Sequence, residues 1–396
     1  MKIQRIPQSV WALGFVSLFM DASSELIHCL LPVFMVSSLG ATVLAVGLVE
    51  GVAEATALIV KVFSGTLSDY FGRRKGLTVL GYGLGALSKP LFAVAGTVHA
   101  VLAARFIDRI GKGMRGAPRD AMVADLTPEA IRGAAYGLRQ SLDTVGAFIG
   151  PLLAMSLMLA WAGDFRKVFW FAAVPAAFSV FLLIFGVHEP KSSETSGRVR
   201  VSIRWPMLKR LGKPYWLVVM VGAVFTLARF SEAFLILRAR QVGLSDAFAP
   251  AVFVLMNVVY ALSAYPAGHL SDHVDRRSLL AAGLVVLIGA DLALAWAGGL
   301  ALTALGVALW GLHMGLTQGL LATMVAAAAP ADLRGTAFGF YNLASGVAML
   351  VASSLAGLLW VKMGSPITFF SGAFLSAASL VLLILTPKNG RLGIKL

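Results

Sequence analysis

A row of ionisable side chains lies within the first apolar stretch of the sequence. Asp21, Glu25 and His28 are spaced four and three residues apart, so a helix would carry all three on one face. An acid buried beside a base stays ionised, whereas an acid buried alone takes up a proton near neutral pH. The spacing therefore predicts a face that binds and releases protons, with Asp21 and Glu25 as the first candidates.

Other apolar stretches are also interrupted by charges: Glu50, Glu54, Arg105, Asp108, Arg109, Lys112, Arg115, Arg229, Glu232 and Asp291. If these stretches cross a membrane, each charge costs at least about 2.5–3.5 kcal/mol at its centre and should face a cavity or a partner. Glu50 and Glu54 are the next candidates for proton coupling. We expect Arg109 to tune the acids or to meet an anionic group. The alternative is a salt-bridge network that only holds the helices together.

The remaining reactive residue types predict neither a metal nor a cofactor. The one cysteine, Cys29, excludes an intramolecular disulfide and an all-thiolate metal site. The six histidines form no HExxH motif, and Asp21, Glu25 and His28 are only a weak metal-binding pattern. The sequence contains no recognisable nucleophile–base pair or phosphate-binding loop, so we do not expect an enzyme.

The composition is that of a chain embedded in lipid. Of 396 residues, 58% are hydrophobic and 13% are charged, and the mean hydropathy is +0.84. Soluble domains are about 45–50% apolar and about 25% charged. The net charge of +14 comes mostly from short loops between apolar stretches. This pattern indicates a basic cytoplasmic face rather than a nucleic-acid partner.

Apolar stretches long enough to cross a bilayer recur along the whole chain. A membrane core about 30 Å thick requires about 20 helical residues. The predicted spans are 10–37, 43–66, 76–96, 98–119, 134–162, 166–187, 214–237, 246–267, 278–297, 299–326, 336–360 and 364–386. Charges weaken the apolar character of 43–66 and 98–119. We therefore expect an all-α integral membrane protein with about twelve transmembrane helices.

The loop charges predict the orientation of these spans. Lysine and arginine concentrate on one side, including the long loop at 188–213, which predicts that both termini are cytoplasmic. That loop divides the chain into a six-helix bundle at 1–187, a basic linker at 188–213 and a second six-helix bundle at 214–396. We expect a multi-pass protein of the bacterial inner membrane that acts as a monomer.

The two bundles are internal repeats. The segment 65–74, GTLSDYFGRR, matches 268–277, GHLSDHVDRR, at an offset of 268 − 65 = 203. The segment 132–137, RGAAYG, matches 334–339, RGTAFG, at an offset of 334 − 132 = 202. Because six spans return the chain to the same side, the repeats have parallel topology.

These features resemble the major facilitator superfamily over essentially the whole chain. The first loop pattern resembles the family signature between helices 2 and 3, and the second is its degraded copy, in which Asp275 replaces Gly72 and suggests a less constrained turn. In such a loop, Asp69 would pair with an arginine such as Arg132 and latch the cytoplasmic side. The expected gating residues are Gly65, Asp69, Gly72, Arg73, Arg132, Asp272, Arg276 and Arg334.

Two further segments resemble motifs of this superfamily. Residues 109–117 resemble the helix 4 signature, with Lys112 in place of the usual glutamine. Gly146, Gly150 and Pro151 resemble the motif associated with antiporters, although Ala154 stands where a glycine is usual. Small residues at this spacing also simply permit close helix packing.

The resemblance implies a secondary transporter that works by alternating access, with proton-coupled efflux of small molecules as our main hypothesis. One alternative is a proton-coupled symporter that imports an anionic metabolite, bound by the arginines of 98–119 and by Arg229. A second alternative is a transport-inactive receptor with the same fold. The expected partners are a small-molecule substrate, protons and the lipid bilayer.

Overall fold

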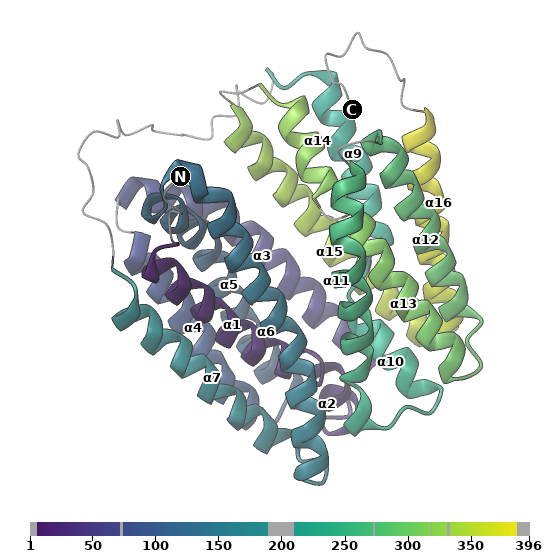
Figure 1. Cartoon of the computed structure of the whole chain (residues 1–396). Helices are drawn as coiled ribbons and strands as arrows, with labels where there is room; N and C mark the ends of the chain where they lie inside the picture. The colour runs from purple at the N-terminus through teal and green to yellow at the C-terminus, as the bar shows by residue number, and fades with distance from the viewer. Residues whose placement is uncertain are drawn as a thin grey trace. The chain divides into compact units, whose positions relative to one another are not determined.

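The computed structural model describes residues 6–71, 74–188, 210–271, 274–317, 319–330 and 333–385, with the side chains of 65–71 and 271 left aside. In these ranges the chain forms α-helices and two short 3-10 helices, and no strand (Figure 1). The contacts divide the chain into two compact units. Unit 1 comprises Met1–Leu39 and Thr56–Val201, and unit 2 comprises Gly40–Ala55 and Ser202–Leu396.

The helices before the basic linker are long and nearly continuous. They are α1 (Gln8–His28), α2 (Leu31–Ser37), α3 (Val43–Phe71), α4 (Arg74–Val94), α5 (Val98–Leu126), the short η1 (Glu129–Ile131), α6 (Arg132–Ala160) and α7 (Phe165–Gly186). In unit 1, α1 packs on α6 and α7, and α4 packs on α5 and α7. The first part of α3, residues 43–55, groups with unit 2.

The helices after the linker repeat this arrangement with more breaks. They are α9 (Lys213–Ala228), α10 (Ala233–Gln241), the short η2 (Asp246–Phe248), α11 (Ala251–Ser271), α12 (Arg276–Ala295), α13 (Leu300–Thr317), α14 (Leu320–Ala328), α15 (Arg334–Met363) and α16 (Ser365–Leu385). In unit 2, α12 packs between α13 and α16, and α9 packs on α15 and α16.

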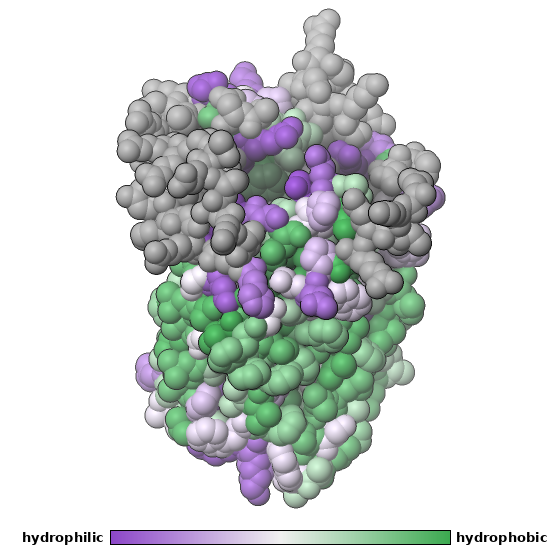
Figure 2. Space-filling model, turned by 60° about the vertical axis from the view of Figure 1, so that its left-hand side comes forward, coloured by the Kyte–Doolittle hydropathy of each residue, from purple (hydrophilic) through white to green (hydrophobic). Residues whose placement is uncertain are grey.

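The described residues contain eleven helical segments that are long and apolar enough to cross a membrane. The twelfth predicted span is α5, which is 29 residues long but carries too many charges to qualify by composition. The expectation of an all-helical membrane protein with about twelve spans is therefore confirmed. Figure 2 shows apolar side chains over the middle of the face in view, with hydrophilic ones gathered toward its two ends.

The first span of each repeat is broken, which the apolar pattern did not predict. The predicted span 10–37 consists of α1 and α2, and 214–237 falls on α9 and α10. The second segment of each pair begins at residues 31 and 233, and 233 − 31 = 202 is the offset of the sequence repeat. Pro32 in the first turn of α2 explains one break, because proline is accepted at a helix start and disrupts a helix interior.

Capping side chains fix several helix starts. The carboxylate of Asp164 accepts hydrogen bonds from the backbone N–H groups of Arg166 and Lys167, at 3.1 and 3.2 Å, where α7 begins. Asp275 accepts from the N–H of Arg277 at the start of α12. This cap gives Asp275 a positive role at the position where the first copy of the loop has Gly72, in addition to the loosened turn expected from the sequence.

Candidate functional site

The acidic face predicted on the first span is present on α1. Glu25 and His28 contact each other, with 3.3 Å between Oε2 and Nδ1. The Asp21 side chain is 25% exposed and that of Glu25 is 21% exposed. These two carboxyl groups are therefore largely enclosed by protein but still reachable by solvent.

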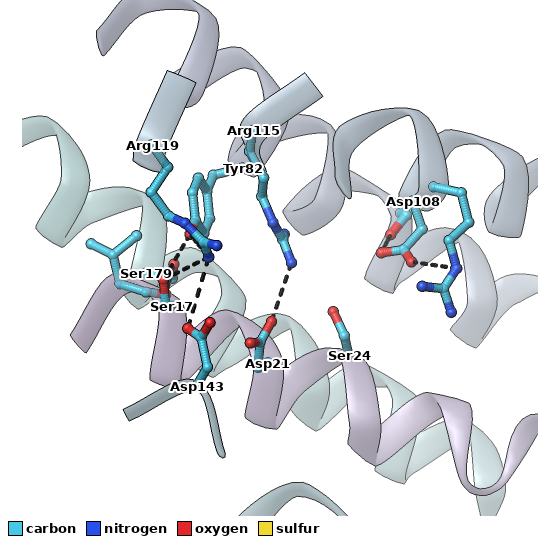
Figure 3. Close-up of polar contacts among 12 residues, drawn as sticks. Ser17, Asp21, Ser24, Tyr82, Asp108, Arg115, Arg119, Asp143 and Ser179 are labelled. Carbon is cyan, nitrogen blue, oxygen red and sulfur yellow. Dashed lines mark hydrogen bonds and ion pairs between the residues drawn. The ribbon is translucent and has the colours of Figure 1, made fainter. Parts of the chain in front are cut away.

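Asp21 is paired with a cation from α5. Arg115 Nη2 lies 3.3 Å from Asp21 Oδ1 (Figure 3), and its guanidinium carbon lies 4.6 Å from the ring centroid of Tyr82 on α4. Stacking on an aromatic face and an ion pair both favour a fixed guanidinium. Lys112, one helical turn earlier, is exposed and interacts electrostatically with both Asp21 and Glu25. The structure thus surrounds the acids of α1 with bases of α5.

A second polar cluster lies one turn away along α1, around Arg119. Arg119 Nη1 donates to Ser17 Oγ at 3.0 Å and lies 3.8 Å from Asp143 Oδ1 of α6 (Figure 3). Ser17 Oγ is also 3.1 Å from the hydroxyl of Tyr82, and Arg139 pairs with Asp143. This cluster ties α1, α4, α5 and α6 together. Neither Arg119 nor Asp143 was among the predicted site residues.

A buried ion pair joins α4 to α5. Lys89 Nζ lies 2.7 Å from Asp108 Oδ1 and donates to Ser24 Oγ of α1 at 3.0 Å. The exposed fractions of the two charged side chains are 1% and 5%. Arg109, the first predicted tuning residue, lies on the other side of the same carboxylate, with 3.9 Å between its Nε and Asp108 Oδ2. The sequence analysis missed Lys89, although a lysine in the middle of the apolar stretch 76–96 was a usable signal.

Close helix packing positions these side chains. A Cβ atom on Gly111 of α5 would lie 2.5 Å from the carbonyl oxygen of Gly81 in α4. A Cβ atom on Gly150 of α6 would lie 2.6 Å from the carbonyl oxygen of Ala22 in α1. These approaches leave no room for a side chain, so glycine lets the helices bring their charges within hydrogen-bond distance.

The other predicted proton-coupling acids lie elsewhere. Glu50, which is 1% exposed, and Glu54 belong to the part of α3 that groups with unit 2. That part packs on α15, because a Cβ on Gly47 would lie 2.3 Å from the carbonyl oxygen of Ser353. The structure therefore does not place Glu50 and Glu54 in the cluster of unit 1.

Arg229 and Glu232 flank the break between α9 and α10. They lie 3.5 Å apart, and each side chain is about one quarter exposed (25% and 24%). Glu25 and His28 stand just before the corresponding break in the first repeat. Broken helices expose backbone groups that commonly bind substrates or ions in transporters. Both breaks thus carry an acid–base pair.

Much of the predicted gating machinery lies outside the described part of the chain. Outside the described residues lie Gly72, Arg73 and Asp272, together with the side chain of Asp69. The backbone of Gly65 lies in α3. Three predicted arginines are described: Arg132 begins α6, Arg276 begins α12, and Arg334 is exposed at the start of α15.

Near these loops, Arg74 pairs with Asp125 and donates to the carbonyl oxygen of Ala121 at 3.2 Å. This contact joins the start of α4 to the end of α5. The residues described contain no cluster of three or more His, Cys, Asp or Glu side chains arranged to hold a metal.

Comparison with known proteins assigns the chain to a family. The model of the Major Facilitator Superfamily matches residues 13–353 and 224–394. An uncharacterized MFS-type transporter of Methanocaldococcus jannaschii is 32% identical over 387 residues, covering 96% of this chain and 95% of the relative. This chain belongs to the Major Facilitator Superfamily. The expected family is confirmed, and with it the expectation of a multi-pass membrane transporter rather than an enzyme.

Two further proteins are similar to this chain. The quinolone resistance protein NorA of Staphylococcus aureus is 27% identical over 197 residues, which cover 50% of this chain and 48% of NorA. The solved structure of the nucleoside transporter NupG superposes with a TM-score of 0.77 at 13% identity, covering 95% of this chain and 98% of NupG. The structural likeness supports the major facilitator fold alone.

Proposed function

We propose that this major facilitator protein is a proton-coupled secondary transporter that exports small molecules. The observation that carries the proposal is the pair of Asp21 and Arg115, in which the carboxylate is three-quarters enclosed yet still reachable by solvent. Such a carboxyl group can exchange a proton with water and is held next to a cation that stabilises its charged form.

The geometry suggests how protons and substrate would compete. When Asp21 is ionised, Arg115 neutralises it, and Lys112 adds positive charge nearby. When Asp21 takes up a proton, its attraction for Arg115 falls and the cation becomes available to other partners. Arg115 is stacked on Tyr82, so it would keep its position in both states. A substrate that engages this site would then favour one protonation state over the other.

Two observations bear on the direction of transport. NorA is a quinolone resistance protein by name, and Gly146, Gly150 and Pro151 form the antiporter-like pattern on α6, packed on the acidic helix α1. Both favour export.

Transport would proceed by rocking of the halves 1–187 and 214–396 about the linker 188–213, with Asp69 and Arg132 latching the cytoplasmic side. The protein would act as a monomer in a bacterial inner membrane, with both termini cytoplasmic.

The test uses everted membrane vesicles energised to an acid interior, with a pH-sensitive dye. Antibiotics, organic cations, carboxylates and metal ions are added in turn to vesicles with the native chain or with Asp21→Asn, Glu25→Gln or Glu129→Gln. Glu129 is an exposed acid in η1 and serves as the control. Proton-coupled export predicts that at least one compound collapses the gradient in native and Glu129→Gln vesicles but not in Asp21→Asn vesicles. If no compound does so, the proposal is wrong.

A second candidate function is the import of an anionic metabolite together with protons. It is favoured by the excess of bases over acids in the polar network of unit 1. The acids of this network are Asp21, Glu25, Asp108, Asp120 and Asp143, and its bases are Lys89, Arg105, Arg109, Lys112, Arg115, Arg119 and Arg139. Saturable uptake of a carboxylate or phosphate into intact cells, driven by an inward proton gradient, would favour import over export.

A further inference from the structure

A carboxyl group in unit 2 is buried without a hydrogen-bond partner among the described residues. Asp291 lies on α12 and is 0% exposed. Neither of its carboxyl oxygens has a hydrogen-bond partner among the residues that the structure describes. The network around Asp21 belongs to unit 1, so Asp291 plays no part in it.

The surroundings of this carboxyl group are apolar and closely fitted. A Cβ atom on Gly372 of α16 would lie 2.7 Å from Asp291 Oδ2 and 3.0 Å from the ring of Phe230. The ring of Phe230 in turn packs on Trp310 and Phe369, with ring centroids 5.6 Å apart in both cases. Glycine at position 372 therefore provides the space that the carboxyl group occupies, and aromatic rings close it off.

The ionisable groups of the neighbouring elements have other partners. Helix α16 carries none. The only one on α13 is His313, whose Nδ1 contacts the carbonyl oxygen of Gly283 at 2.8 Å, about two turns from Asp291 along α12. At the nearby break, Arg229 pairs with Glu232.

A cation from α10 contacts the end of α12. Arg238 donates to the carbonyl oxygens of Leu294 and Ala297 at 2.9 and 2.8 Å, where α12 ends. Its guanidinium is thus used to cap the helix. Among the residues that the structure describes, the elements packed around Asp291 therefore supply no counter-ion to its carboxyl group.

An ionised carboxylate in such surroundings is far less stable than the neutral acid, because nothing replaces the water that solvated its charge. Asp291 stands four residues before the end of α12 at Ala295, about 6 Å along the helix, so a small opening of the packing would bring it to water. The close packing at Gly372 would keep a proton on the carboxyl group. The nearness of Asp291 to the helix end would let that proton pass to water when the packing opens.

We propose that Asp291 is a second proton-binding site, located in unit 2, which holds a proton while α16 packs on α12 at Gly372 and releases it to water when that contact opens. The carboxyl O–H bond breaks, the proton passes to water, and the carboxylate remains; reclosure requires the reverse transfer. The site extends the proposed proton coupling from α1 to the second half of the chain and rests on that proposed function for its role in transport.

The test begins with a measurement that does not depend on transport. Infrared difference spectra of the purified full-length protein in lipid, recorded over a pH titration, report the C=O band of protonated carboxyl groups. We expect one band that titrates in the native protein and in Asp246→Asn, a partly exposed control in unit 2, and is missing from Asp291→Asn. Gly372→Ala should shift the titration of that band, because the added methyl group displaces the carboxyl group. A set of bands unchanged by Asp291→Asn would overturn the proposal.

The second measurement is proton movement in everted vesicles. Asp291→Asn mimics the neutral acid, so the protein should fold normally while its substrate-driven proton flux falls at least tenfold. If Asp291→Asn couples as the native protein does, Asp291 carries no proton of the transport cycle and this proposal alone fails. If the infrared band titrates but no compound moves protons through the native protein, the proton site stands and the proposed transport function fails.

Discussion

The buried pair of Lys89 and Asp108 gives the sharpest test of how the charges of unit 1 are held. We consider Lys89→Met, Asp108→Ala and the double variant. Lys89→Met keeps the length of the side chain and removes its charge, leaving Asp108 with Arg109, whose Nε lies 3.9 Å from Asp108 Oδ2. Asp108→Ala leaves a buried lysine with only the hydroxyl group of Ser24, next to the cations of α5.

The structure sets the expected order of these effects. Removing one partner of a buried ion pair costs about 3–5 kcal/mol when the other charge is left uncompensated. Asp108→Ala should fall in that range, because it removes the one acid that several cations share. Lys89→Met should cost less, about 2–3 kcal/mol, since Arg109 partly compensates and the main loss is one charge-assisted hydrogen bond. The double variant should be less destabilised than the sum of the single variants, with a coupling free energy of about 1.5–3 kcal/mol.

The assay is equilibrium unfolding of the purified protein in mixed micelles titrated with sodium dodecyl sulfate, followed by tryptophan fluorescence and circular dichroism. Ser88→Ala is a control at the edge of the same site, because it removes an uncharged hydroxyl group that lies 3.2 Å from Asp108 Oδ1 and 2.7 Å from the carbonyl oxygen of Gly85. Strictly additive single effects, or single effects below about 1 kcal/mol, would refute the assignment of this pair as an interior anchor of α4 and α5.

Three further predictions use the same unfolding assay. Gly150→Ala should destabilise the protein by about 1–3 kcal/mol, because its Cβ would lie 2.6 Å from a backbone oxygen of α1. The control Gly137→Ala, whose Cβ would have nothing within 4 Å, should stabilise the protein by about 0.5–1 kcal/mol. Equal effects would contradict the close approach of α1 and α6. Arg238→Met should cost about 3 kcal/mol or more, because this side chain donates several charge-assisted hydrogen bonds at the end of α12. The more exposed Arg240 is the control, and Arg240→Met should cost about 0–1 kcal/mol. Similar losses would exclude the capping role. The backbone N–H of Lys167 holds the pKa of the Asp164 carboxyl below its usual value of 3.8. The helix cap made by Asp164 therefore stabilises the fold above that pH and is lost as the pH falls below it. The stability difference between the native protein and Asp164→Ala should shrink in acid, and a difference that grows in acid would contradict the capping role.

Hydropathy and repeat spacing in the sequence determined most of the fold. Twelve apolar stretches, a basic linker and an offset of 202 to 203 residues predicted an all-helical membrane protein of two six-helix repeats, and the loop motifs added the resemblance to the major facilitator superfamily. The prediction succeeded because a segment of about 20 apolar residues in lipid must satisfy its own backbone hydrogen bonds, and an α-helix does so. The same sequence put Asp21, Glu25 and His28 on one face, since helical periodicity is a local property.

Only the tertiary structure decided which charges meet. Lys89 and Asp108 are distant from Ser24 in sequence, and their contact depends on how α1, α4 and α5 pack. The placement of Glu50 in unit 2 depends on glycine-mediated packing of α3 on α15. Asp291 looked like any other acid in an apolar stretch, and its isolation follows from the space left by Gly372 on a helix 81 residues later (372 − 291 = 81). Ion pairing and burial arise between helices, so the sequence determined which charges enter the membrane and the packing determined their partners.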